Sequence, residues 1–127
     1  RLVRRICEKC KEEVELDNAT ITRVMKIVDS VPDNSGFAVD KSKDLKFYKG
    51  KGCDECKESG YKGRSGIYEV FVMTPEIEKM ILSGIVSEHD IKAITQKEGM
   101  VSMVQDGILK AMEGITTIEE VFRVTEE

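Results

Sequence analysis

The sequence predicts an α+β fold, in which a small stapled knuckle module with a short antiparallel β ribbon is followed by a bundle of short α-helices. Three observations support this prediction. The chain of 127 residues carries its cysteines in two closely spaced pairs. Apolar side chains alternate with a period of two in the middle of the chain, which is typical of strands. From Pro75 onward they recur with a helical period, and capping residues mark the helix ends.

The cysteine pairs are Cys7 with Cys10 and Cys53 with Cys56, and the sequence contains no other cysteine. Each pair has the C-x-x-C spacing with which one tight turn directs two thiolates at a single metal ion. Two such turns supply four sulfur ligands, which fill a tetrahedral zinc site and leave no open position for catalysis. The sequence therefore predicts a structural Zn²⁺ site that staples the knuckle. An iron centre of the rubredoxin type uses the same ligands and stays open as an alternative.

Two other uses of the cysteines fit the sequence less well. A disulfide framework requires an oxidising compartment, and because we find no signal peptide we expect reduced cysteines and a cytoplasmic location. A thioredoxin-like dithiol needs one C-x-x-C pair at the junction of a strand and a helix, which would leave the second pair without a role. The paired spacing therefore favours a metal site.

The N-terminal part of the chain is expected to contain two helical segments. Residues 1–6 are predicted to be the last turns of a helix, and a longer helix is predicted from about residue 18 to residue 31. The apolar face of the first segment is Leu2, Val3 and Ile6. The longer helix has Asn18 or Thr20 as its expected cap, and its core-facing stripe is Ile21, Val24, Met25, Val28 and Val31. Residues 32–44 carry no regular pattern, and we expect a mobile insertion there.

Two strands are predicted around the second cysteine pair. They cover residues 45–49 and 67–73, and we expect them to pair as an antiparallel ribbon across the knuckle. The second of them should place Tyr68, Val70 and Val72 on one face. Glycines follow each other between the strands at Gly60, Gly63 and Gly66. Their spacing differs from that of a phosphate-binding P-loop, so we expect turns with positive φ there.

Four short helices are predicted after Pro75, each with an inward-facing apolar stripe. Their start signals are Pro75, Ser87 with Asp90, Ser102 with Gln105 as a capping box, and Thr116 with Glu119. Their stop signals are Gly84, Gly99 and Gly114. The only histidine, His89, falls in a first helical turn and is predicted to be a surface residue without a metal or catalytic role.

The charge is distributed unevenly along the chain. Residues 1–64 carry 15 Lys and Arg against 12 Asp and Glu, a net charge of +3, whereas residues 65–127 carry 5 against 12, a net charge of −7. The excess of cations near the cysteines compensates four thiolates on a divalent metal. An acidic chain without tryptophan does not fit a nucleic-acid-binding protein. Because no apolar run approaches the roughly 18 residues of a membrane helix, we expect a soluble protein without direct membrane insertion.

The motifs together resemble the C-terminal tetracysteine zinc-binding and helical segment of the type II secretion and type IV pilus assembly ATPase family. The resemblance covers nearly the whole chain in the right order. It rests on residues 1–11 (RLVRRICEKCK), 50–56 (GKGCDEC), 60–69 (GYKGRSGIYE), 99–100 (GM), 106–107 (DG), 113–116 (EGIT) and 119–121 (EEV). The 42 residues between Cys10 and Cys53 are long for this family, and we expect the extra length in residues 32–44.

The resemblance implies a part of a hexameric motor that hydrolyses ATP beneath the inner membrane. ATP and Mg²⁺ would be bound only by a RecA-like core upstream, because this sequence has no P-loop and no Walker motif. The implied partners are the rest of the ATPase, neighbouring subunits of a homo-hexamer and an inner-membrane platform protein. That places the protein in the cytoplasm, peripheral to the inner membrane.

We accordingly predict two units: a zinc-binding module over residues 1–73 and a helical lobe over residues 74–127. The expected function is that of a structural and interaction module that is not itself catalytic. The acidic lobe is expected to meet protein partners through surface charges such as Glu119 and Glu120. The alternative is a free-standing zinc-ribbon protein that binds nucleic acid or another protein.

Overall fold

The computed structural model describes residues 1–31, 46–70, 73–84 and 87–126. Over these residues the fold is α+β, as predicted, with two small antiparallel sheets of two strands each and five α-helices. The insertion expected over residues 32–44 lies outside the described residues. None of the described helices combines the length and the apolar character that a membrane crossing requires.

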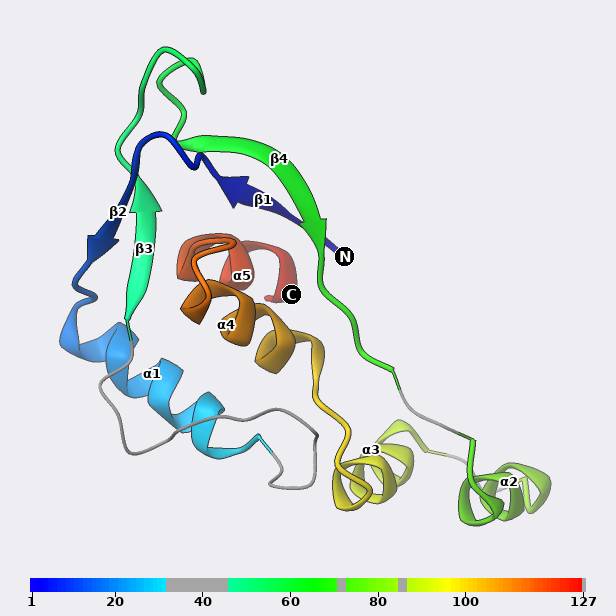
Figure 1. Ribbon diagram of the computed structural model, residues 1–127. Helices are drawn as coiled ribbons and strands as arrows, with labels where there is room; N and C mark the ends of the chain where they lie inside the picture. The colour runs from blue at the N-terminus through cyan, green and yellow to red at the C-terminus, as the bar shows by residue number, and fades with distance from the viewer. Residues whose placement is uncertain (32–45, 71–72, 85–86, 127) are drawn as a thin grey trace.

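The first sheet pairs β1 (Leu2–Ile6) with β4 (Tyr61–Gly66), and it forms one long curved ribbon (Figure 1). The helix predicted over residues 1–6 is therefore wrong. Val3 and Ile6 are both buried although they lie three residues apart, a spacing that also fits a helix face. In a regular strand they would point to opposite faces, but the register shifts between Arg4 and Ile6. This bulge turns both side chains inward.

The second sheet pairs β2 (Lys11–Val14) with β3 (Phe47–Gly50). The strand predicted over residues 45–49 is found as β3, but its expected pairing with the strand over 67–73 is wrong, because β3 pairs with β2. Residues 67–70 are not in a strand, and the strand that leaves the second knuckle is β4, which lies earlier in the sequence. Pairing with β1 overrides the weak strand propensity of the two glycines in β4.

The first helix, α1 (Asn18–Asp29), is confirmed with a different cap. Neither Asn18 nor Thr20 caps it, because the Asp17 carboxylate accepts a hydrogen bond of 2.7 Å from the Thr20 N–H. Aspartate offers the same acceptor chemistry one residue earlier. Val24 and Val28 lie on the buried face, as predicted.

The four predicted C-terminal helices all exist: α2 (Pro75–Leu82), α3 (Glu88–Lys97), α4 (Met103–Met112) and α5 (Ile118–Thr125). Ser87 caps α3 and Ser102 forms the expected capping box with Gln105. The cap of α5 is Thr117, one residue after the predicted Thr116. Thr116 is instead held by β1, because its hydroxyl donates a 2.8 Å hydrogen bond to the Arg4 carbonyl.

The main hydrophobic core joins α1, α4 and α5 with β3, and α2 and α3 lie to one side of it (Figure 1). Its buried members are Val24, Val28, Phe47, Ile108, Ala111, Ile118 and Val121. Residues from both halves of the sequence therefore share one core. The division into units 1–73 and 74–127 stays a prediction.

A buried carboxylate fastens α5 to β1. Glu120 is 1% exposed, which corrects the expectation that it is a surface charge, whereas its neighbour Glu119 is exposed. The Glu120 carboxylate accepts hydrogen bonds from the Arg4 guanidinium at 2.7 Å and the Arg4 N–H at 2.9 Å. Arg123 donates two more, at 2.8 and 3.0 Å. The carboxylate is thus fully paired although it is buried.

The contact between α4 and α5 depends on a glycine. A Cβ atom added at Gly107 would lie 2.7 Å from Cγ1 of the buried Val121. Valine is stiff at χ1 and cannot easily move away. Gly107→Ala should therefore lower the free energy of unfolding by about 1–2 kcal/mol, since overpacking outweighs the roughly 1 kcal/mol gained in helix propensity.

Chemical denaturation of Gly107→Ala, Val121→Ala and the double variant tests this contact. The double variant should be more stable than the sum of the two single losses predicts, because the shorter side chain makes room for the new methyl group. A stabilised Gly107→Ala protein would mean that the two helices can separate at little cost.

Candidate metal centre

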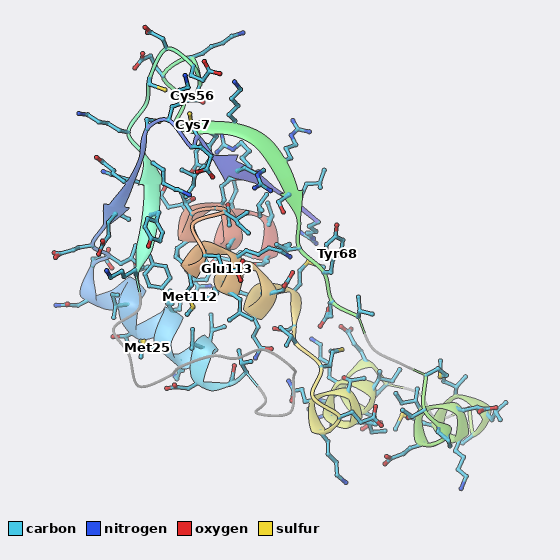
Figure 2. The ribbon with its side chains drawn as sticks, in the orientation of Figure 1. Cys7, Met25, Cys56, Tyr68, Met112 and Glu113 are labelled. Atoms are coloured by element: carbon cyan, nitrogen blue, oxygen red, sulfur yellow. The ribbon has the colours of Figure 1, made fainter. Side chains whose placement is uncertain are left out.

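The two sheets bring the four cysteines together, and Figure 2 shows Cys7 and Cys56 at one tip of the molecule. Cys7 and Cys10 lie in the turn between β1 and β2, and Cys53 and Cys56 lie in the loop between β3 and β4. Because β1 pairs with β4 and β2 with β3, both loops leave the sheets side by side. All four cysteines are free, and those labelled in Figure 2, Cys7 and Cys56, are buried.

The geometry of the sulfur atoms fits a tetrahedral metal site. The four Sγ atoms all lie within 4.8 Å of one another. The Cys7–Cys53 and Cys10–Cys56 Sγ distances are both 3.8 Å, and the Cys53–Cys56 distance is 3.7 Å. A tetrahedron with zinc–sulfur bonds of 2.3 Å has edges of about 3.8 Å, whereas a disulfide brings two sulfurs to about 2 Å. The donor set and its spacing therefore fit zinc or iron, and no disulfide is formed.

Backbone N–H groups surround the sulfurs and favour their charged form. Gly60 and Cys53 donate to the Cys56 sulfur at 3.2 and 3.3 Å, and Gly52 donates to the Cys10 sulfur at 3.3 Å. Such donors orient thiolate ligands and disperse their charge. This role of Gly52 and Gly60 is not among the predictions from the sequence, although the positions of both glycines close to the second cysteine pair are a usable signal.

Gly60 also has a steric reason to be glycine. Its φ is +80°, and a Cβ atom there would lie 2.6 Å from the Gly50 carbonyl oxygen. The backbone of β3 and the chain that leaves the knuckle are therefore in contact. Further bonds join the two loops, since the Cys7 N–H donates to the Gly60 carbonyl and the Lys51 N–H to the Cys10 carbonyl, both at 3.0 Å. The positive φ predicted at Gly60, Gly63 and Gly66 is confirmed for the first two, but it is wrong for Gly66, which lies in β4 without a positive φ.

The thiols differ in acidity because their surroundings differ. Burial raises the pKa of the Cys56 thiol, but the amide donors of Cys53 and Gly60 outweigh burial and lower it to about 6. Burial and, to a smaller extent, the neighbouring sulfurs raise the pKa of Cys10 to about 12, against the opposing hydrogen bond from the Gly52 N–H. One thiolate is thus easily formed, whereas four together require a cation to compensate them.

Cationic side chains flank the cluster without entering it. Lys11 forms an ion pair with Glu8 at 3.1 Å, and Lys62 forms one with Glu55. The Glu55 carboxylate raises the pKa of Lys62, and Cys7 and Cys53 add to this effect. These two lysines are therefore paired mainly with glutamates, and the cysteines make only a smaller electrostatic contribution at Lys62.

Within the described ranges, the cysteine cluster is the only group of three or more His, Cys, Asp or Glu side chains close enough to share a metal ion. His89 is exposed on α3, as predicted. The cluster offers four sulfur donors, of which the two from Cys7 and Cys56 are buried, and this donor set suits a structural metal centre.

A family described as Type II/IV secretion system protein matches residues 1–123. The chain belongs to this family. The match extends over both sheets, over α1 to α4 and over α5 as far as Arg123, and it includes both cysteine pairs.

Relatives of this type II/IV secretion family member are named after secretion and pilus assembly. The chain is 41% identical over 127 residues to the type IV pilus assembly ATPase PilB of Thermus thermophilus and 40% identical to PilB of Pseudomonas aeruginosa. It is 35% identical to the type II secretion system protein E of Pseudomonas aeruginosa. All of the chain is covered in these comparisons, but it spans only 13%, 20% and 22% of the respective relatives.

Proposed function

We propose that this chain is the zinc-stabilised, non-catalytic module near the C-terminal end of a secretion or pilus assembly ATPase. The observation that carries the proposal is the cluster of four sulfurs, all within 4.8 Å of one another, in a member of this family. Cys7, Cys10, Cys53 and Cys56 would hold the ion. Bound zinc would supply coordination bonds between two turns that lie 42 residues apart in the sequence.

The module's mechanical role follows from where its cysteines lie. Both turns stand at the ends of two-stranded sheets, which are marginal structures without further support. Fixing the turns to each other makes one stiff unit of the two sheets. The Glu120 pairing then connects β1 with α5 and hence with the core. A force applied to the knuckle would thus reach the helices through hydrogen-bonded contacts.

The proposed partners are the rest of the ATPase, neighbouring subunits of a homo-hexamer and an inner-membrane platform protein, on the cytoplasmic side. The acidic C-terminal half is the part proposed to meet them, and the exposed Glu119 is a suitable probe. If so, Glu119→Lys in the full-length protein should weaken assembly in native mass spectrometry. Unchanged assembly would place the contact elsewhere.

The second candidate function, a free-standing zinc-ribbon protein, has less support. Its support is the cluster of four cysteines, which a zinc ribbon also has, but the family match extends far beyond this cluster. The coding sequence upstream distinguishes the two: a P-loop in the same reading frame supports the motor.

The non-catalytic assignment predicts a clear outcome for the chain alone. Purified protein should give no steady-state ATP hydrolysis above a buffer control, because the sequence lacks the P-loop lysine and the adjoining Ser or Thr that hold phosphate and Mg²⁺. The full-length protein, assayed in parallel, should hydrolyse ATP. Turnover that follows the 127-residue chain through purification would contradict the assignment.

A further inference from the structure

The hydrogen-bonded pairing of the first sheet continues one residue beyond the start of β1, to Arg1. Leu2 lies opposite Gly66 in the register, so Arg1 lies opposite Ile67. These two residues exchange both backbone hydrogen bonds: the Arg1 nitrogen donates to the Ile67 carbonyl at 3.1 Å, and the Ile67 N–H donates to the Arg1 carbonyl at 2.9 Å. This exchange is the hydrogen-bonded pair of an antiparallel ladder.

Beyond Ile67 the chain keeps the alternation of a strand. In an antiparallel ladder the next residue directs its N–H away from the partner strand. Tyr68 does so, since its N–H donates to the Asp106 carboxylate on α4 at 2.9 Å. The N–H of Glu69 should then point back toward the β1 side. Among the described residues it has no hydrogen-bond partner.

The side chains of this stretch are also uncovered. Tyr68 is 63% exposed and Val70 is 73% exposed, and Leu2 on the facing strand is 58% exposed. Aromatic and β-branched residues in alternation are typical of a strand that packs on one face. Figure 2 shows Tyr68 where β4 has ended and the chain continues toward α2, away from the main core. Residues 68–70 thus have the sequence and direction of a strand, but among the described residues no strand pairs with them.

We propose that the residues directly preceding Arg1 in the full-length protein continue β1 and pair antiparallel with residues 68–70. The second residue before Arg1 would lie opposite Glu69 and accept the hydrogen bond of its N–H. This inference rests on the proposed function, in which the chain is part of a longer ATPase, and the matched relatives are several times longer than the chain. The upstream segment is favoured over a second copy because β1 already delivers it in register.

The test is amide hydrogen exchange at single-residue resolution on the full-length protein and on the 127-residue chain. In the full-length protein the Glu69 amide should exchange at least about 100-fold more slowly than an unstructured amide. In the shorter chain it should exchange at nearly the unstructured rate. Tyr68 is the internal control, because its N–H is bonded to Asp106 and should be protected in both proteins.

Three results would overturn the proposal. One is rapid exchange of Glu69 in the full-length protein. Another is equal protection in both proteins, which would place its partner within the 127 residues. The third is protection in the shorter chain that grows with protein concentration and is missing from the full-length protein, which would identify a second copy as the partner. Zinc content and ATP hydrolysis of the same full-length sample report on the proposed function independently.

Discussion

Replacing Cys53 by serine is expected to remove the bound metal and to unfold the knuckle. The variant keeps three thiolates, so zinc would take a water as its fourth ligand and lose affinity. Structural zinc sites contribute on the order of 10 kcal/mol to folding, which is comparable to the whole stability of a small domain. The Cys53 sulfur lies 3.8 and 3.7 Å from the Cys7 and Cys56 sulfurs, so its loss removes one of the four proposed ligands.

Thermal unfolding followed by circular dichroism, with metal content measured on the same samples, tests this prediction. Asp54→Ser is the matched control, because it places serine in the same turn at an exposed position that offers no sulfur. The control should keep its metal and its melting temperature. A Cys53→Ser protein that melts like the control would show that the knuckle does not depend on the fourth sulfur.

The second large effect is expected at Glu120. Glu120→Ala should lower the free energy of unfolding by about 3 kcal/mol, because it deletes a buried carboxylate that pairs with two arginines and a backbone N–H. The Arg4 and Arg123 side chains are 47% and 57% exposed, so both can regain water, and the loss stays below that of a fully buried triad. Denaturant titration measures it, with Glu119→Ala as the exposed control expected to change stability by less than about 0.5 kcal/mol.

The same carboxylate gives a pH dependence of known sign. Burial raises the pKa of Glu120, but the hydrogen bonds from Arg123 and Arg4 outweigh burial and lower it from 4.5 to about 2. A carboxyl group whose pKa is lower in the folded state stabilises the fold when the pH is above the pKa of the unfolded state. For Glu120 this contribution is lost as the pH falls from about 4.5 toward 2. The lost stability should be about 3 kcal/mol. Glu120→Gln should be less stable at neutral pH and should lose less on acidification; equal slopes for both proteins would contradict the assignment.

The cysteine cluster and the helix signals could be predicted from the sequence because they depend on local spacing. A C-x-x-C turn directs two sulfurs to one point wherever it lies, and two turns in a reduced chain have few other uses. Caps act within three residues, so Ser87 and Ser102 were correctly identified. At Asp17 and Thr117 the prediction was off by a residue or more because neighbouring side chains offer equivalent acceptors.

The strands were harder to predict because their partners are distant in the sequence. β1 has the spacing of a helix face, and only its bulge explains why Val3 and Ile6 are buried together. β4 contains glycines and charged residues and is a strand because β1 lies beside it. Residues 67–70 show the opposite case, since their composition favours a strand but no described segment pairs with residues 68–70. The buried Glu120 was missed because its partner Arg4 lies 116 residues away.

X-ray absorption at the zinc K edge, combined with metal analysis of protein purified without added metal, measures the proposed centre most directly. We expect one zinc per chain with four sulfur neighbours at about 2.3 Å and no nitrogen or oxygen ligand. Stoichiometric iron, a mixed ligand shell, or a folded and reduced protein that contains no metal would contradict the structural zinc centre.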